Sequence, residues 1–479
     1  MTKLKNSYLF LLTLTIFLVP SNLFFKFFES SAYVNGLLVD YLIPKLYLSD
    51  LPILLILSLW QIQTFEVQKF KKQVQSKLKK LSSVTSMTLM TLITLIALLA
   101  LNLFSSANLL ASLWYFFKLM EMGLFGWFLF QYRHLLTHKI ILLSFLSSLV
   151  FQSLLAIYQF HTQFSFLNYL FLGEPNLSNY IGLAKGIFNG VEQILPYGTT
   201  AHPNILGGFI VVYWFISTKL SSSRLRIKDL KFKIFYLITS VFAAYTLWLT
   251  QSVSAWLALL ISTIMYSFNP IIDKSRKSFR FCLPAVKAGF LVSGFLIFLI
   301  SPLAINLLAT KYPANKSLTR RATLNQAATA MFIANPLTGV GLNNFTARAE
   351  EYLPKKEVAR FVQPVHHLGL LILSETGLLG LIIIIFILFM FIQKHQALST
   401  KLQTKSNNQN TKIQKNHLKF LNLNFGNCLG FVPRGSLWEI WDLGFLILLP
   451  LAALDHYLLT NQTGLLLLVL LPQFLILNP

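Results

Sequence analysis

Residues 138–160 read HKIILLSFLSSLVFQSLLAIYQF, and this stretch decides the fold class. Lys139, near one edge, is its only Lys, Arg, Asp or Glu. A run of about 20 apolar residues is long enough to cross the hydrocarbon layer of a bilayer as a helix. Backbone groups in lipid must be satisfied within the segment, so such a run has to be helical. The stretch therefore predicts a transmembrane helix.

Comparable runs recur along nearly the whole chain. The protein has 479 residues, of which 55% are hydrophobic and 12% charged, whereas soluble domains carry about 25% charged residues. Length and apolarity predict about twelve spans, near 7–25, 47–63, 84–104, 109–131, 138–160, 204–221, 233–250, 252–268, 287–308, 367–393, 439–457 and 463–478. The spans 233–250 and 252–268 are joined by a few residues around Gln251, which predicts a helical hairpin. We expect an all-α polytopic membrane protein.

The formal net charge of +24 indicates the orientation of the spans. Nucleic acid is one possible partner for such a charge. Here most of the basic residues fall in every second loop between spans, which is the positive-inside pattern of cytoplasmic loops. We therefore expect no nucleic-acid partner, a place in the cytoplasmic (inner) membrane, and both termini in the cytoplasm. Three long segments, 26–46, 162–203 and 309–366, are then predicted on the outer side.

These patterns divide the chain into four parts. Residues 1–308 form an N-terminal bundle of nine spans, and residues 309–393 hold a long outer loop, 309–366, with the tenth span. Residues 394–438 are a cytoplasmic linker that includes the polar, low-complexity stretch 401–420. Residues 439–479 form the last two spans. The N-terminus is interpreted as the first helix rather than a signal peptide, because it lacks a small-residue cleavage site.

Two cysteines, Cys282 and Cys428, fall in segments predicted to be cytoplasmic. They are far apart in the sequence, and no metal-ligand spacing surrounds them. We expect free thiols, with neither a disulfide framework nor a zinc site.

The outer loop 309–366 begins with an arginine doublet. Arg320 and Arg321 lie outside, against the positive-inside trend. Guanidinium groups pair bidentately with phosphate oxygens, and a lipid diphosphate at the outer leaflet would suit them. The alternative is a pair of solvated loop charges.

The same loop continues with NPLTGVGLNNF over residues 335–345. Gly339 and Gly341 allow tight turns and the close approach of a ligand. Successive N–H groups here could hold an anion. A purely structural turn after Pro336 is the more common role of such a motif.

Two histidines open the tenth span. The imidazole of His366 or His367 can take a proton from an attacking hydroxyl near neutral pH; an interfacial histidine without a task is the alternative. Glu375 lies roughly 13 Å deeper in the helix. An acid within a span is a functional candidate, either for orienting a ligand-binding group or for pairing inside the bundle.

Further polar residues lie near span ends. The segment 196–208, PYGTTAHPNILGG, places His202 and Asn204 at the outer mouth of the bundle, although Asn204 could only cap its helix. Asp455 and His456 close the eleventh span and could line the same outer cavity. Lys118 and Glu121 are three residues apart on the fourth span, a spacing that lets them neutralise each other.

The run from Arg321 to Gly380 resembles the domain shared by O-antigen ligases, O-antigen polymerases and bacterial protein O-oligosaccharyltransferases. The matching residues are Arg321, Ala327, Ala328, Pro336, Leu337, Gly339, Val340, Gly341, Asn344, Phe345, His366, Leu373, Glu375 and Gly377. The segment 198–208 is similar to the Gly-Thr-x-x-His-Pro-Asn element of that family. This chain has His367 where the family has Asn, and it has Val253, Leu195 and Pro196 where arginines are usual.

The resemblance implies a glycosyltransferase with a helical fold of the lipid-phosphate-sugar-dependent (GT-C-like) type. The donor would be a glycan on undecaprenyl diphosphate, transferred with inversion and without a metal or other cofactor. His366 matches the histidine that activates or positions the acceptor hydroxyl, and Arg321 matches an arginine that holds the diphosphate. The substrate-binding residues expected overall are Arg321, Arg320, His202, Asn204, Gly339, Gly341, Asn344, His367 and Glu375. We expect Arg321 and His366 to meet in one water-accessible site on the outer side.

Two questions stay open at this point. A transporter or lipid-linked glycan flippase is the alternative function; such folds often carry internal repeats, and the hydropathy shows no clear repeat here. The acceptor hydroxyl could belong to a lipid core, a growing glycan end, a protein side chain or a wall polymer.

Overall fold

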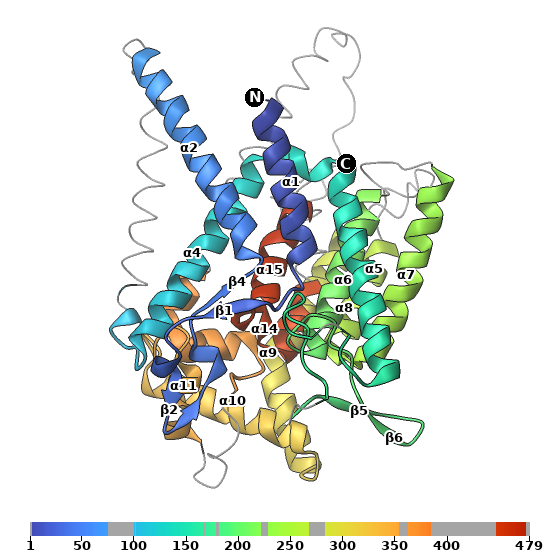
Figure 1. Ribbon diagram of the computed structural model, residues 1–479. Coiled ribbons are helices and arrows are strands. Elements are labelled where there is room, and N and C mark those ends of the chain that lie inside the picture. The colour runs from blue at the N-terminus through green and yellow to red at the C-terminus, as the bar shows by residue number, and fades with distance from the viewer. Residues whose placement is uncertain are drawn as a thin grey trace, which may run out of the picture.

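The computed structural model describes residues 2–74, 100, 102–166, 168–178, 182–221, 229–267, 283–353, 363–384 and 447–475. The described part is mostly helical (Figure 1). Nearly all of the predicted span 84–104, the linker 394–438 and both cysteines lie outside the described residues.

Helices form the body of the molecule. They are α1 (Thr2–Leu18), α2 (Asp50–Val74), α4 (Leu109–Gln131), α5 (Lys139–Thr162), α6 (Pro203–Lys219), α7 (Leu230–Thr250), α8 (Val253–Ser267), α9 (Leu283–Lys311), α10 (Lys316–Ala334), α11 (Phe345–Tyr352), α14 (Tyr457–Thr460) and α15 (Gln462–Leu475). Two further helices cover Leu368–Ile384 and residues 447–454. Short 3-10 helices are η1 (Glu29–Ala32), η2 (Asp40–Leu42) and η4 (Arg133–Thr137).

Three antiparallel strand pairs add to the helices and were not predicted. They are β1 (Phe24–Lys26) with β4 (Lys45–Tyr47), β2 (Tyr33–Val34) with β3 (Leu37–Leu38), and β5 (Lys185–Phe188) with β6 (Val191–Ile194). β2, β3, β5 and β6 lie within segments predicted to be outer loops, whereas β1 and β4 also include residues 24–25 and 47, which were predicted to be the ends of spans.

Several described helices have the length and composition of membrane spans. Helices α4, α5 and α7 are long and apolar enough to cross a bilayer. Shorter apolar helices occur at Leu4–Leu18, Asp50–Thr64, Val253–Ile264, Phe295–Lys311, Leu368–Ile384 and Gln462–Phe474. The chain is thus a multi-pass helical membrane protein, as the sequence predicted.

Predicted and observed helix boundaries differ in several places. Helix α2 runs to Val74, well past the predicted end near residue 63. Helix α1 ends at Leu18 rather than near residue 25, and Pro20, which has no N–H to donate, follows directly. The span predicted at 439–457 is helical over 447–454 and breaks at Asp455, after which the short helix α14 begins. This break places a buried polar turn, Asp455 and His456, between two apolar segments.

The core is built around the last helix of the chain. Helix α15 packs against both α4 and α6 and lies in the middle of the bundle (Figure 1). Aromatic side chains link α5 to α6 and α15: the ring centroid of Phe145 lies 4.6 Å from that of Tyr213 and 5.1 Å from that of Phe474. Helices α7 and α8 both pack on α6, and the turn between them is at Gln251, as predicted. The central place of α15 brings residues 455–456 next to elements from much earlier in the sequence.

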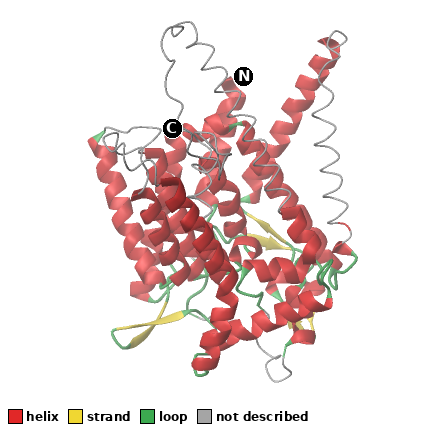
Figure 2. Cartoon of the chain, turned by 180° about the vertical axis from the view of Figure 1, so that it is seen from behind, coloured by secondary structure: helices red, strands yellow, loops and turns green. Residues whose placement is uncertain are grey.

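The segments predicted to be outer loops gather at one end of the bundle. In both views the strand pairs, α10 and α11 lie away from the start of α1 (Figures 1 and 2). A hydrogen bond joins two of these segments, since the Asn343 side chain donates to the Tyr41 carbonyl at 3.1 Å. Another holds the first segment to the start of α4, where the Asn108 side chain donates to the Ser31 carbonyl at 2.7 Å. This end of the molecule holds most of the polar residues that the sequence singled out.

Candidate active site

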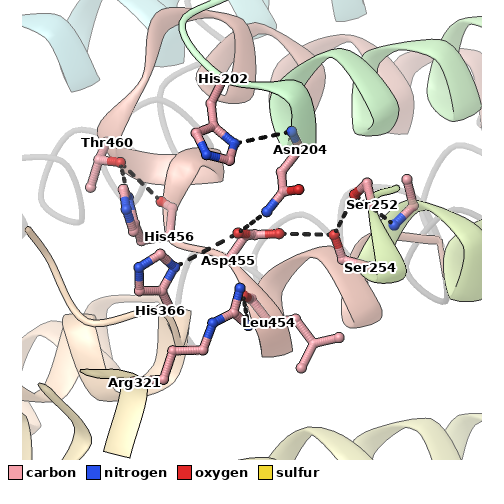
Figure 3. Close-up of polar contacts among 11 residues, drawn as sticks. His202, Asn204, Ser252, Ser254, Arg321, His366, Leu454, Asp455, His456 and Thr460 are labelled. Carbon is pink, nitrogen blue, oxygen red and sulfur yellow. Dashed lines mark hydrogen bonds and ion pairs between the residues drawn. The ribbon is translucent and has the colours of Figure 1, made fainter. Parts of the chain in front are cut away.

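Asp455 is the centre of a polar cluster at this end of the bundle (Figure 3). The residue is 4% exposed and lies in the break between helix 447–454 and α14. Its Oδ1 accepts a hydrogen bond from Asn204 Nδ2 at 3.1 Å, and its Oδ2 accepts one from Ser254 Oγ at 2.8 Å. Each oxygen of this buried carboxylate is therefore held by a different helix.

His366 faces the same carboxylate. Its Nδ1 lies 3.8 Å from Asp455 Oδ1, which is ion-pair distance and longer than a hydrogen bond. Within the described part of the chain this Nδ1 has no hydrogen-bond partner. The side chain is 18% exposed, and its ring packs against that of His456 at 4.9 Å with an interplanar angle of 62°. The imidazole is thus paired with a carboxylate while part of it stays accessible.

Arg321 reaches the cluster from α10. Asn315 caps the start of this helix by accepting hydrogen bonds from the N–H groups of Ser317 and Leu318. The Arg321 Nη1 donates to the carbonyl oxygen of Leu454 at 3.1 Å, directly before Asp455 (Figure 3). Arg320, the adjacent residue on α10, is half-buried.

The charges of the cluster keep Asp455 ionised. Burial raises the pKa of this carboxyl, but interaction with His366 and the positive charge of Arg321 outweigh it and hold the pKa at about 2. The carboxylate is therefore an anion that can stabilise a cation forming beside it.

His202 and Asn204 enter from the start of α6. The His202 Nδ1 accepts a hydrogen bond from the Asn204 N–H at 3.1 Å, so His202 is the helix cap, and the alternative that Asn204 caps this helix is wrong. The His202 residue is exposed. Desolvation by the surrounding protein nevertheless lowers its pKa to about 4; the carboxylate of Asp455 opposes this shift, and the positive charge of Arg321 adds to it. His202 is therefore neutral at pH 7.

His456 closes the other side of the cluster. Its Nδ1 lies 2.5 Å from Thr460 Oγ1, and its ring packs edge-on against Tyr41 at 5.6 Å. Burial lowers its pKa well below the ordinary value, so this imidazole is also neutral.

The motif 335–345 folds into a separate structure around Glu375, which we call the glutamate clasp: Gly339, Gly341, Asn343, Asn344, Phe345, Glu375 and Gly377. The Glu375 carboxylate accepts the backbone N–H of Asn343 at 3.0 Å and that of Phe345 at 3.1 Å. The Gly341 N–H donates to the Glu375 carbonyl at 3.0 Å. The clasp thus pins the outer loop to helix 368–384.

The glycines of the clasp allow backbone to approach backbone. Gly339 has φ +66°, and a Cβ added there would lie 2.4 Å from the backbone carbon of Glu375. Asn344 is fully buried; its Oδ1 accepts the Asn108 N–H at 2.6 Å, and its Nδ2 donates to Ser112 Oγ at 2.6 Å. Of the two roles considered for this motif, these contacts favour the structural turn.

His367 is engaged at both ring nitrogens. Its Nδ1 accepts the Leu370 N–H at 3.1 Å, and its Nε2 lies 2.9 Å from the Phe298 carbonyl oxygen. The residue is 4% exposed and serves as a cap for helix 368–384. Its contacts favour a structural role, whereas His366 points to the polar cluster.

The structure therefore separates the predicted site residues into two groups. Arg321, His202, Asn204 and His366 meet at Asp455, with Arg320 adjacent to Arg321 on α10. Gly339, Gly341, Asn344 and Glu375 lie in the clasp, and His367 caps its helix. Within the described residues, no group of three or more His, Cys, Asp or Glu side chains has the arrangement of a metal site.

Sequence reasoning understated one residue of the cluster and missed another. Asp455 was noted only as a residue that could line the cavity, although an acid at the end of an apolar span is a strong functional signal. Ser254 was not singled out, because a serine near the start of an apolar helix gives no sequence signal for binding a carboxylate.

The fold and the cluster define a multi-pass membrane protein with a polar site at one end of its helical bundle. Residues 238–385 match the family model described as O-antigen ligase. This part of the chain therefore resembles the ligase domain of the O-antigen ligase family, a family of glycosyltransferase-type enzymes. The match includes Arg321, Ser254, His366 and the clasp, whereas His202, Asn204 and Asp455 lie outside it. No curated protein and no solved structure gives a match to this chain.

Proposed function

We propose that this protein transfers a glycan from undecaprenyl diphosphate to an acceptor hydroxyl at the outer face of the cytoplasmic membrane, by ligation or polymerisation. The observation that carries the proposal is the pairing of His366 with the ionised carboxylate of Asp455, beside Arg321. The match to the O-antigen ligase family model supports the same class of reaction, since that family acts on lipid-linked glycans generally.

In the proposed reaction His366 is the general base. It accepts the proton of the acceptor hydroxyl as that oxygen forms a bond to the anomeric carbon. The bond from this carbon to the diphosphate oxygen breaks on the opposite face, so the configuration inverts. Undecaprenyl diphosphate leaves with the electron pair.

Two charged residues, Asp455 and Arg321, stabilise the charges that form in that step. The imidazolium of His366 gains the carboxylate of Asp455 as a partner, which favours proton transfer to the ring. The guanidinium of Arg321 is placed to stabilise the negative charge that develops on the departing diphosphate. Arg320, on the same helix, is proposed to contribute to diphosphate binding, and the exposed His202 to contact the substrate.

The proposed topology has about twelve spans in a GT-C-like bundle, with both termini in the cytoplasm and the site on the outer side. Its support is the gathering of segments 26–46, 162–203 and 309–366 at the end that holds Asp455. The start of α1 lies toward the opposite end (Figure 1).

The test uses the purified protein in liposomes with an undecaprenyl-diphosphate-linked glycan and candidate acceptors. The variants His366→Ala and Arg321→Ala should each reduce transfer by about 100-fold or more, the scale of a lost general base or charge stabiliser. His161→Ala and Lys316→Ala are matched controls; Lys316 is an exposed cation on the same helix as Arg321. Both controls should transfer normally.

Two results would contradict the proposal. One is normal transfer by both His366→Ala and Arg321→Ala. The other is movement of the lipid-linked glycan across the liposome membrane without any transfer, which would favour a transporter or flippase. Analysis of the surface glycans of a deletion strain then identifies the acceptor. The strain would lose all long glycan chains, only the attachment of these chains, or protein glycosylation, and each loss points to a different acceptor.

A further inference from the structure

We propose that Ser254 is a positioning residue of this site, whose hydroxyl fixes the Asp455 carboxylate so that Oδ1 faces His366. This inference rests on the proposed function and concerns a residue that does not itself contact the reacting atoms.

The two oxygens of the Asp455 carboxylate have different partners. Ser254 Oγ donates to Oδ2 at 2.8 Å, and this leaves Oδ1 for Asn204 and His366. Ser254 is 2% exposed and Asp455 is 4% exposed, so water has little access to replace either contact. Hydrogen bonds from α6 and α8 therefore define the plane of the carboxylate (Figure 3).

Arg321 does not fix the orientation of the Asp455 carboxylate. Its hydrogen bond goes to the Leu454 carbonyl, which fixes the backbone before Asp455 but leaves the rotation of the side chain free. Among the described residues, only Ser254 donates a hydrogen bond to Oδ2 in the structure. Loss of its hydroxyl would let the carboxylate turn while its backbone stayed in place.

The start of α8 is itself held firmly. A Cβ added to Gly207 on α6 would lie 3.0 Å from the Cβ atoms of both Ser252 and Ala255, so the two helices are in close contact there. The hydroxyl of Ser252 lies 3.2 Å from that of Ser254. When Ser252 donates to Ser254, the two hydroxyls and the carboxylate form a chain in which each hydrogen bond polarises the next.

Such a contact matters because catalysis depends on the placement of the charge. A displacement of about 1 Å in a reacting constellation can cost on the order of 100-fold in rate. The Asp455 carboxylate and the His366 ring are already 3.8 Å apart, so a rotated carboxylate would no longer be paired with the imidazolium as it forms. The effect should fall on the chemical step rather than on donor binding.

The experiment compares Ser254→Ala with Ser254→Thr in the liposome assay. Ser254→Ala should lower kcat by about tenfold and leave the KM for the lipid-linked donor within about twofold, as expected when an interaction of the transition state alone is lost. Ser254→Thr keeps the hydroxyl and should retain most of the activity. If Ser254→Ala fails to insert, Ser254→Cys, which keeps the size and donates only weakly, should show the same fall in kcat.

Ser262→Ala is the matched control. Ser262 is on the same helix and 5% exposed, and its hydroxyl donates to Leu259 of its own helix at 2.8 Å. The substitution removes one buried serine hydroxyl from α8 without touching Asp455, and transfer should be unchanged. Equal losses in the two alanine variants would show that Ser254 only stabilises the helix, and would overturn the inference.

A double-mutant cycle decides whether Ser254 acts through Asp455. In the Asp455→Asn background, Ser254→Ala should cause no further loss, because residues that act through one contact are not additive. The inference is overturned if Ser254→Ala gives the same factor in both backgrounds, or if it raises KM alone. Full activity of both His366→Ala and Arg321→Ala would instead refute the proposed function, whereas an inactive His366→Ala together with a normal Ser254→Ala refutes this inference alone.

Discussion

The imidazole of His366 lies 3.8 Å from the carboxylate of Asp455, although the chain between them contains the whole of helix 368–384 and all of residues 385–446. The break between helix 447–454 and α14 places the carboxylate there, and the start of helix 368–384 places the imidazole. Two polar turns at helix ends thus bring the imidazole and the carboxylate together.

Removing the charge of Asp455 should slow the proposed reaction. Asp455→Asn keeps the shape of the side chain but withdraws the anion that stabilises a protonated His366. We expect kcat to fall by about 100-fold, comparable to the loss of one preorganised electrostatic contact. Asp229→Asn, a substitution of the exposed cap of α7, is the control and should transfer normally; a similar loss in both variants would count against the role of Asp455.

Asp455 should also make stability depend on pH. Its pKa is about 2 in the folded protein, below the value of about 3.9 for an unfolded Asp. A depressed pKa contributes stability that is fully present above the unfolded pKa and is lost as pH falls through the folded pKa. Between pH 6 and pH 2 in detergent, the melting temperature of the wild type should therefore fall more than that of Asp455→Asn. Parallel pH curves for the two proteins would contradict the assigned charge.

The glutamate clasp should not tolerate a side chain at Gly339. Gly339→Ala places a Cβ 2.4 Å from the Glu375 backbone, at a positive φ that disfavours Ala. We expect a clear loss of thermal stability and easier proteolysis of the outer loop. Gly123→Ala is the control, because a Cβ there meets nothing within 4 Å. Unchanged stability of Gly339→Ala would show that the clasp is looser than described.

A buried ion-pair network forms a second test of the fold. The Lys118 Nζ lies 2.5 Å from Asp50 Oδ2 and 2.9 Å from Glu121 Oε2, so the predicted pair of Lys118 and Glu121 is confirmed and Asp50 joins it. Lys118→Met leaves two buried carboxyl groups without their cation, a loss that costs about 3–5 kcal/mol in such networks. Thermal unfolding measures this loss of stability. The control is Lys139→Met, at an exposed cation of α5, which should leave stability unchanged.

The helices were predictable from sequence because long apolar runs have few structural alternatives. The segment 109–131 coincides with α4, and 138–160 differs little from α5. The strand pairs escaped prediction because each strand is only two to four residues long, too short to show alternation. Each pair closes within a single segment of the chain, 24–47 or 185–194.

The site was predictable only in part, for a different reason. Arg321 and His366 belong to a recognisable motif. The same motif pointed to Gly339 and Gly341, but it did not distinguish an anion-binding loop from a structural turn. Glu375 decides between these, because its carboxylate occupies the N–H groups of Asn343 and Phe345. The contact of Asp455 with Ser254 depends on helix packing across most of the chain, which no local pattern records.

The position of α15 in the centre of the bundle has a consequence for biogenesis. Helix 447–454 and α15 leave the ribosome after the other described helices, yet they supply the carboxylate and fill the core. A nascent chain that has inserted only its earlier helices therefore holds the histidine and the arginine without their acidic partner. The proposed site is therefore complete only after helix 447–454 and α15 have packed against the earlier helices.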